Sequence, residues 1–265
     1  MPSNESIVNQ VQVAECAAGQ IPAWNDFVAA NPGGTFYHLA QWADINRAAL
    51  GHKTTLLAAS CQGQLQGVMP VTHVSSPFFG RILCSMPFVN YGGPCAATAE
   101  AQAALIGAAK ALADARRVRY LELRSAAPLE TDMTASTHKI SMSIDLQSDP
   151  DLLWNAYSSK HRTNIRRSYK NELEVTSGGI ELLQVFYDVM QASWRDLGTP
   201  LYGRNYFEEI LQTFPDNTRI FLCSRRGGTR GSGLQRIFQR PWRECGPEAC
   251  RQRAGCRPIT CCTGK

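Results

Sequence analysis

The chain has 265 residues, enough for two domains of ordinary size, each with its own hydrophobic core. Its 44% hydrophobic and 9% aromatic content is typical of a globular protein. No window approaches 18 uninterrupted apolar residues, which argues against a transmembrane helix. The N-terminus lacks the basic and then apolar regions of a secretory signal, so we expect a cytoplasmic protein.

The net charge of +5 is concentrated at the C-terminal end of the chain. Residues 225–265 hold 10 Lys and Arg against 2 Asp and Glu, whereas residues 1–224 hold 17 against 20. Five of the ten cysteines also lie in this last segment. The overall basicity is therefore no argument for nucleic-acid binding by the rest of the chain.

The first 148 residues alternate between strand and helix patterns. The pattern predicts, in chain order, a strand at 5–14, helices at 21–30 and 38–50, a hairpin at 54–74 turning near Gly63, a strand at 81–88, a helix at 99–116 and strands at 119–125 and 139–146. This order predicts a mixed α/β domain over residues 1–148.

A second unit is expected to begin at Asp149, which precedes a proline and so resembles a helix N-cap. The pattern then predicts a helix from Asp149 onward, a basic helix from Lys160, a strand at 173–175, helices at 180–194 and 205–214, and a strand at 218–224. The unit breaks off where its sheet should continue. Residues 149–224 are thus expected to form only the N-terminal part of a second domain.

The basic helix contains the sequence SKHRTNIRRSYK. At 100° per residue its five cations fall within an arc of about 160°, and they are Lys160, Arg162, Arg166, Arg167 and Lys170. Such an arc is compatible with a solvated helix face, with a clamp for phosphate groups, or with DNA binding. The slightly acidic surroundings argue against DNA.

Tyr91, Gly92 and Gly93 follow a predicted strand in the sequence SMPFVNYGGP. Paired glycines either make a tight turn or allow the backbone to approach a ligand closely. No catalytic nucleophile can be nominated, because no His lies at motif spacing from a Ser or Cys. No phosphate-binding glycine motif is present either.

Residues 225–265 read differently from the rest, with many Arg, Gly and Cys residues and no sustained period. They lack both a C-x-x-C pair and a histidine, so we expect no metal site. In the shifted frame, degenerate codons permit Val-Trp-Ala-Gly-Ser-Leu from the Glu244–Cys245 boundary. They also permit Leu-Leu-Tyr-Trp further on. We therefore expect an out-of-frame, disordered tail from about residue 225 and a longer natural protein.

Several segments together resemble the FemAB-like branch of the GNAT-fold acyltransferases. They are FYHLAQW (36–42), GRILCSMPFVNYGGP (80–94), YLELR (120–124), KHRTNIRRSYKNELEV (160–175) and FYDVMQASWRDLGTP (186–200). More narrowly, they are similar to FemAB-type proteins associated with the exosortase/PEP-CTERM system. The likeness extends over roughly residues 10–224.

The resemblance implies tandem GNAT-like domains and transfer of an acyl or aminoacyl group to an amine acceptor in cell-envelope or exopolysaccharide biosynthesis. Acyl-CoA or aminoacyl-tRNA would be the donor substrate, and no permanently bound cofactor is expected. The cations of the basic helix would line a site for the phosphate-bearing substrate. Two alternatives stay open: a non-enzymatic nucleic-acid-binding protein that uses the same helix, and a non-functional truncated product.

Overall fold

The computed structural model describes residues 10–76, 80–136, 148–225 and 228–236. These residues form two compact units. The first contains residues up to Asp132 together with Asn205–Asn217, and the second contains Met133–Arg204 and Thr218–Gln235. The mixed α/β fold class predicted from the sequence is confirmed.

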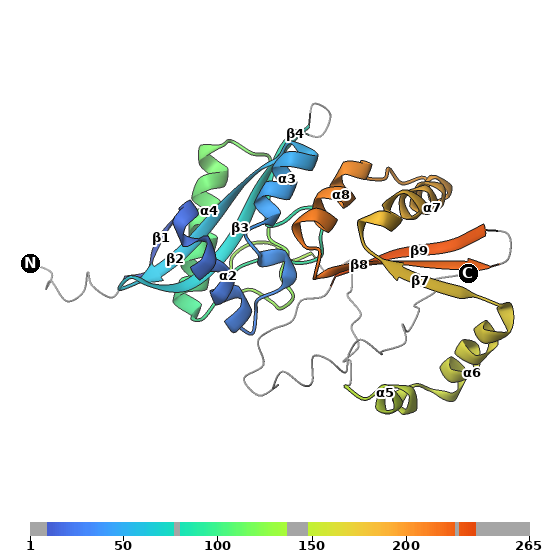
Figure 1. Cartoon of the computed structure of the whole chain (residues 1–265). Helices are drawn as coiled ribbons and strands as arrows, with labels where there is room; N and C mark the ends of the chain where they lie inside the picture. Colours follow the sequence, from blue (N-terminus) through green and yellow to red (C-terminus); the bar gives the residue numbers. More distant parts are fainter. Residues whose placement is uncertain (1–9, 77–79, 137–147, 226–227, 237–265) are drawn as a thin grey trace, which may run out of the picture. The chain divides into compact units, whose positions relative to one another are not determined.

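A six-stranded sheet forms the first unit (Figure 1). Its strands are β1 (Gln12–Glu15), β2 (Lys53–Cys61), β3 (Gln64–Ser76), β4 (Gly80–Cys84), β5 (Cys95–Ala96) and β6 (Leu121–Glu122). They are ordered β1-β2-β3-β4-β6, with β5 paired to β3. All pairs are antiparallel except β4 with β6.

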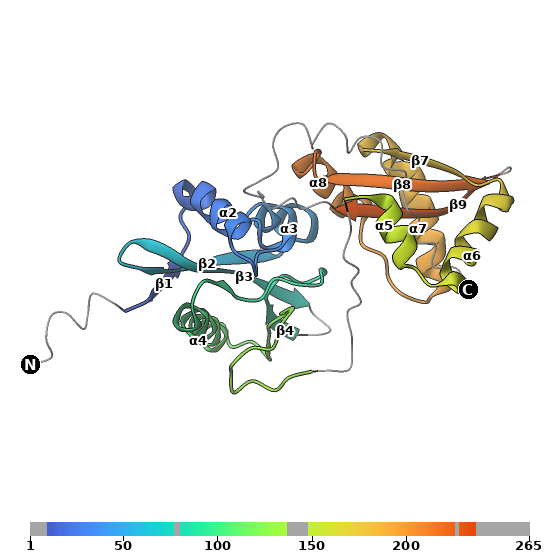
Figure 2. The same cartoon turned by 90° about the horizontal axis from the view of Figure 1, so that it is seen from below.

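Helices cover both faces of this sheet, as Figure 2 shows. They are α2 (Ile21–Ala30), α3 (Trp42–Leu50) and α4 (Ala99–Ala115), with short 3₁₀ turns η1 (Ala18–Gln20) and η2 (Phe36–His38). Because side chains alternate along a strand, β2 and β3 each contribute to two cores. Leu57 and Met69 pack with α4, whereas Leu56 and Val68 pack with Trp24 of α2.

Helix α8 (Arg204–Thr213) comes late in the sequence, yet residues 205–217 belong to the first unit. Phe214, just after α8, has its ring centre 4.6 Å from that of Phe36 and 5.8 Å from that of Trp42. Asn205 donates from Nδ2 to the carbonyl oxygen of Ala49 at 3.1 Å. This assignment differs from the predicted linear boundary, which put residues 149–224 in one domain.

The second unit holds a sheet of three strands in the order β7-β8-β9. Its elements are α5 (Pro150–Ala156), α6 (Ser159–Ser168), η3 (Tyr169–Asn171), β7 (Glu174–Gly178), η4 (Ile180–Leu182), α7 (Leu183–Asp196), β8 (Thr218–Arg225) and β9 (Gly228–Arg236). The Asp149 side chain caps α5 by accepting from the Asp151 N–H at 2.9 Å, as predicted.

Three expectations about elements need correction. The helix predicted at 38–50 begins at Trp42, after the turn η2. The strand predicted at 81–88 ends at Cys84, because the chain turns there with left-handed φ angles at Met86 and Phe88. Gly228–Arg236 forms β9 next to β8, so the structureless tail expected from residue 225 is wrong over this range.

The strand predicted at 139–146 and residues 237–265 lie outside the described residues. None of the helices in the described ranges is both long enough and apolar enough to cross a membrane.

Candidate functional site

Helix α6 carries most of the predicted cations, and its ends explain why the helix forms. The Ser158 hydroxyl accepts from the His161 N–H at 3.3 Å, which satisfies one of the free amides of the first turn. Arg166 and Arg167 lie in the last turn, where the negative end of the helix dipole favours cations. No residue of α6 is buried, so the helix presents its polar side chains to solvent.

Two of the cations contact α5 rather than solvent alone. Arg162 donates from Nη1 to the carbonyl oxygen of Asn155 at 3.2 Å. The guanidinium carbon of Arg166 lies 5.3 Å from the centre of the Trp154 ring, a cation–π contact. These two arginines therefore hold α6 against α5.

Lys160 and Arg167 are exposed, and their side chains make no hydrogen bond, ion pair or ring contact with any described residue. They are seven residues apart, so on a helix their side chains differ in direction by only about 20°. The predicted single arc is thus divided into an anchoring pair and an accessible pair. The accessible pair is the better candidate for contact with a phosphate group.

Lys170 does not lie on α6. It belongs to the 3₁₀ turn η3, and Glu172 beyond it adopts a left-handed conformation with φ 50°. The direction predicted for the Lys170 side chain, which assumed a continuous α-helix from Lys160, is therefore wrong. Lys170 is nevertheless exposed close to the end of the basic helix.

Tyr91, Gly92 and Gly93 lie in the first unit, at a cavity of about 630 Å³. The cavity is lined by the residues after α2, by Tyr91–Pro94 and by residues 124–129. Its size is that of a small-molecule site. Tyr91 and Gln102 are among its lining residues, and no hydrogen bond from either side chain to a described residue is found.

The two glycines bring the chain close to Arg124. Gly92 and Gly93 both donate their N–H groups to the Arg124 carbonyl oxygen, at 3.1 and 2.8 Å. A Cβ atom on Gly92 would lie 2.5 Å from the Cβ of Met86, and one on Gly93 would lie 3.0 Å from the Arg124 oxygen. The backbone approached so closely is that of Arg124, and both amides are already paired.

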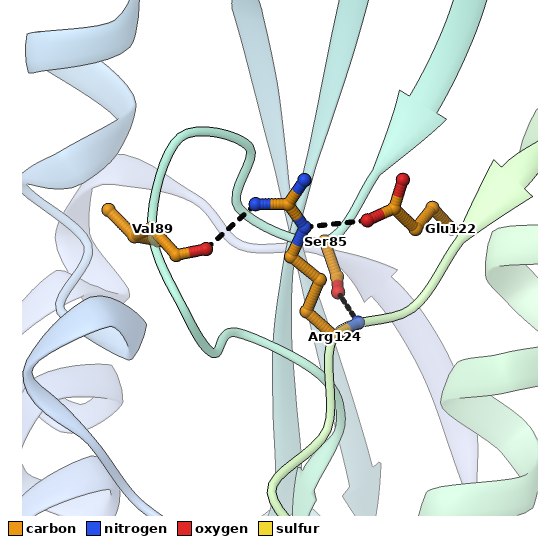
Figure 3. A network of polar contacts seen from close by, with 4 residues as sticks. All are labelled: Ser85, Val89, Glu122 and Arg124. Atoms are coloured by element: carbon orange, nitrogen blue, oxygen red, sulfur yellow. Dashed lines mark hydrogen bonds and ion pairs between the residues drawn. The ribbon is translucent and has the colours of Figure 1, made fainter. Parts of the chain in front are cut away.

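Arg124 joins three segments, as Figure 3 shows. Its Nε donates to Glu122 at 2.7 Å, its Nη1 donates to the Val89 carbonyl at 2.8 Å, and its N–H donates to the Ser85 hydroxyl at 2.8 Å. This network fixes the loop between β4 and Tyr91. The sequence pattern identified Arg124 only as a strand residue, since nothing in residues 120–124 indicates its partners.

His38, on η2, fastens the same loop from the other side. Its Nε2–H donates to the Gly93 carbonyl at 2.8 Å, and its Nδ1 accepts from the Thr35 N–H at 3.1 Å. Burial lowers the pKa of His38, and the Thr35 N–H faces a deprotonated Nδ1. The neutral imidazole is therefore a structural link.

Two hydroxyls are hydrogen-bonded to a histidine ring, Thr35 Oγ1 to His38 Nδ1 at 2.8 Å and Ser158 Oγ to His161 Nδ1 at 3.0 Å, and each of them also accepts a backbone N–H as a cap. Burial raises the pKa of the Cys84 thiol to about 12, so it stays protonated at neutral pH. Among the described residues, no three His, Cys, Asp or Glu side chains gather as metal ligands would. The chemistry that this arrangement can support is binding and orientation of substrates.

Comparison with known proteins places these features in context. Residues 127–234 match the model of the FemAB family, a stretch that includes α5, α6, α7, α8, β7, β8 and most of β9. The match contains every predicted cation of the basic helix. It ends ten residues beyond Ser224.

The fold is that of FemX. Its crystal structure matches with a TM-score of 0.59 and 18% identity, over 80% of this chain and 57% of FemX. The chain thus spans little more than half the length of that protein. A transcriptional regulator from Bacillus halodurans C-125 gives a TM-score of 0.36 at 14% identity, over 51% of this chain and 100% of that one. No curated protein matches the sequence significantly.

Proposed function

We propose that this chain is a FemAB-type N-acyltransferase that transfers an acyl or aminoacyl group to an amine. The observation that carries the proposal is the family match over residues 127–234, which contains the basic helix. The FemX-like fold of the chain supports it. On this proposal the two units correspond to tandem GNAT-like domains.

Transfer needs no covalent enzyme intermediate. The lone pair of the acceptor amine attacks the carbonyl carbon of an activated ester or thioester. The C–N bond forms as the ester or thioester bond breaks, and the amine proton passes to the leaving oxygen or sulfur. Holding the two substrates in line accounts for rate enhancement without a nucleophile.

The substrate contact assigned to α6 is with phosphate. Aminoacyl-tRNA and acyl-CoA, the two donor classes proposed, both carry phosphate groups, as does a nucleotide-linked cell-wall precursor. Lys160 and Arg167 can reach such a group without breaking a contact inside the unit. Arg162 and Arg166 support the helix from the α5 side.

The test is a transfer and binding assay on paired variants. Lys160→Ala/Arg167→Ala should weaken binding of the phosphate-bearing substrate at least about tenfold, since each lost contact is charge-assisted. Arg47→Ala/Lys110→Ala, two cations of the first unit that are paired with Asp44 and Asp132, is the control. Equal loss in both pairs would indicate only a general charge effect, and no loss in either would remove the assignment.

We further propose that the chain acts in cell-envelope or exopolysaccharide biosynthesis.

We also propose that the reading frame of the gene changes after the codons of β9. Strand β9 extends to Arg236, and the family match extends to residue 234. The proposed change of reading frame therefore lies beyond residue 225. The apolar strings permitted by the shifted frame begin later, at residue 245. Resequencing the gene across codons 225–265 tests this: an inserted or missing base supports the proposal, and an intact frame rejects it.

A further inference from the structure

A group of cations gathers on the α4 face of the first unit, away from the basic helix in sequence. In register, Lys53 of β2 pairs with His73 of β3, and His73 pairs with Leu83 of β4. Residues two apart on a strand share a face, so Arg81 lies on the same face as His73 and Thr55 on the same face as Lys53. This is the face that α4 covers, through Leu57, Met69 and Leu83.

Arg116 brings a further cation to this place. It caps the C-terminal end of α4, and its Nη2 donates to the Thr55 hydroxyl at 3.1 Å. Thr55 is buried and Arg116 is half-buried, so the guanidinium is held against the sheet rather than extended into solvent. Lys53, His73, Arg81 and Arg116 together are called the α4-end cluster below.

Within the part of the chain that the structure describes, no carboxylate forms an ion pair with the α4-end cluster. The ion pairs of the described residues involve Arg47, Lys110 and Arg124, and no side-chain partner of Lys53 or Arg81 is found among these residues. His73 has a shielded Nε2 that also lacks a hydrogen-bond partner there. Burial, then the charges of Arg116 and Arg81, lower the pKa of His73. Cations this close repel one another unless an anion lies between them.

We propose that the α4-end cluster binds a phosphate-type anion, with Arg116 and Arg81 as forked donors, Lys53 as a point charge and His73 as a donor when protonated. Guanidinium groups fit the tetrahedral oxygens of phosphate, and Thr55 keeps one guanidinium oriented beforehand. The site is separate from the cavity at Tyr91, because none of its residues lines that cavity.

The cluster also predicts how binding depends on pH. A bound anion favours the protonated imidazole, so it raises the pKa of His73 from its lowered value. Among the described residues, the charges of Arg116 and Arg81 act on His73, Lys53 lies opposite it in register, and Arg119 is bonded to the Arg81 backbone, all of them cationic. Binding therefore strengthens as the pH falls through the range in which His73 gains its proton.

Titration of the whole chain with inorganic phosphate, followed by NMR of the His73 ring, tests the site. Arg116→Gln should weaken phosphate binding at least about tenfold. Arg81→Gln, which breaks no bond among the described residues, should do the same and covers the case in which Arg116→Gln unfolds. Arg47→Gln, an exposed arginine on α3 paired with Asp44, should leave binding unchanged. Equal affinity in all four proteins would overturn the proposal.

Sulfate serves for the pH series because it keeps its charge between pH 5 and 8. Wild-type affinity should rise as the pH falls, and His73→Gln should remove that dependence. A pH dependence that persists in His73→Gln would overturn the role of His73. Vesicles containing phosphatidic acid, compared at equal phosphate concentration, distinguish a lipid headgroup from a free phosphate as the source.

Discussion

The two units differ most in how they bury their apolar side chains. In the first, helices cover both faces of the sheet, and Trp24, Trp42, Met69 and Leu105 are completely buried. In the second, five large apolar side chains are exposed among those the structure describes: Leu152 of α5, Val175 of β7, Ile180 of η4, Val185 of α7 and Leu197 at its C-cap. Strand β7 is exposed at four of its five residues.

This difference in burial indicates which unit should contribute more to the free energy of unfolding and which carries the accessible candidate site. A covered sheet fixes its loops, and the loop that ends at Gly93 is held by Arg124 and His38. In the second unit the polar side chains of α6 are accessible, since no residue of that helix is buried. We therefore expect core substitutions to cost more stability in the first unit than in the second, which carries the proposed phosphate contact on α6.

Truncating a core leucine of the first unit should have the largest effect. Leu105→Ala removes a side chain packed between α4 and the sheet, and should lower the free energy of unfolding by about 3 kcal/mol. Leu183→Ala in the second unit should cost less, because a smaller core relaxes around the cavity. Chemical denaturation followed by tryptophan fluorescence and by circular dichroism measures both. Equal costs would contradict the comparison.

A side chain added at Gly92 should have the second-largest effect on the free energy of unfolding. Gly92→Ala places a methyl group 2.5 Å from the Cβ of Met86, so the loop must shift, at about 1–3 kcal/mol. Gly107→Ala is the control, because its Cβ meets nothing within 4 Å and it lies within α4. That variant should gain about 0.5–1 kcal/mol through helix propensity. The free energy of unfolding should thus fall in Gly92→Ala and rise in Gly107→Ala. A similar fall in both variants would exclude the steric explanation for Gly92.

The stability of the first unit should also depend on pH. Since the pKa of His38 is lower in the folded protein than in the unfolded chain, its contribution is complete above about pH 6.5. It is lost as the pH falls toward the folded value, at about 1.4 kcal/mol for each unit of pKa difference. Denaturation between pH 5 and 8 should therefore show weaker folding in acid. His38→Gln should flatten the slope, with His52 and His73 accounting for the remainder.

Changing an exposed apolar residue of the second unit should have the smallest effect. Leu197 is 74% exposed, so Leu197→Ser should alter the free energy of unfolding by less than about 0.5 kcal/mol. A cost above about 1 kcal/mol would mean that this surface is covered in solution.

The sequence predicted the local elements well and the tertiary links poorly. Hydrophobic periodicity predicted the β2–β3 hairpin and α4, and capping chemistry predicted the Asp149 cap. Both signals depend only on residues close together in the sequence. The left-handed φ angles at Met86 and Phe88 could not be predicted from the sequence, because residues other than glycine adopt them only when packing against the rest of the unit imposes them. The same holds for α8, whose assignment to the first unit depends on Phe214 reaching Phe36.

Among the site residues, the cations of α6 could be predicted from spacing, whereas their division could not. Whether a cation is accessible depends on neighbours such as Trp154 and Asn155 on another helix. Gly92 and Gly93 were expected to form a tight turn or to let the backbone approach a ligand; in the structure they approach the Arg124 carbonyl, and a ligand contact stays a prediction. Their partner, the carbonyl of Arg124, lies about thirty residues away and leaves no pattern in the sequence.

The most direct test of the proposed function is a transfer assay read by mass spectrometry. The whole chain is incubated with isotopically labelled aminoacyl-tRNA or acyl-CoA and an amine-bearing cell-wall precursor. We predict a labelled amide product, reduced at least about tenfold in Lys160→Ala/Arg167→Ala and unchanged in Arg47→Ala/Lys110→Ala. No product with either donor class, or a product formed equally by all three proteins, would contradict the account.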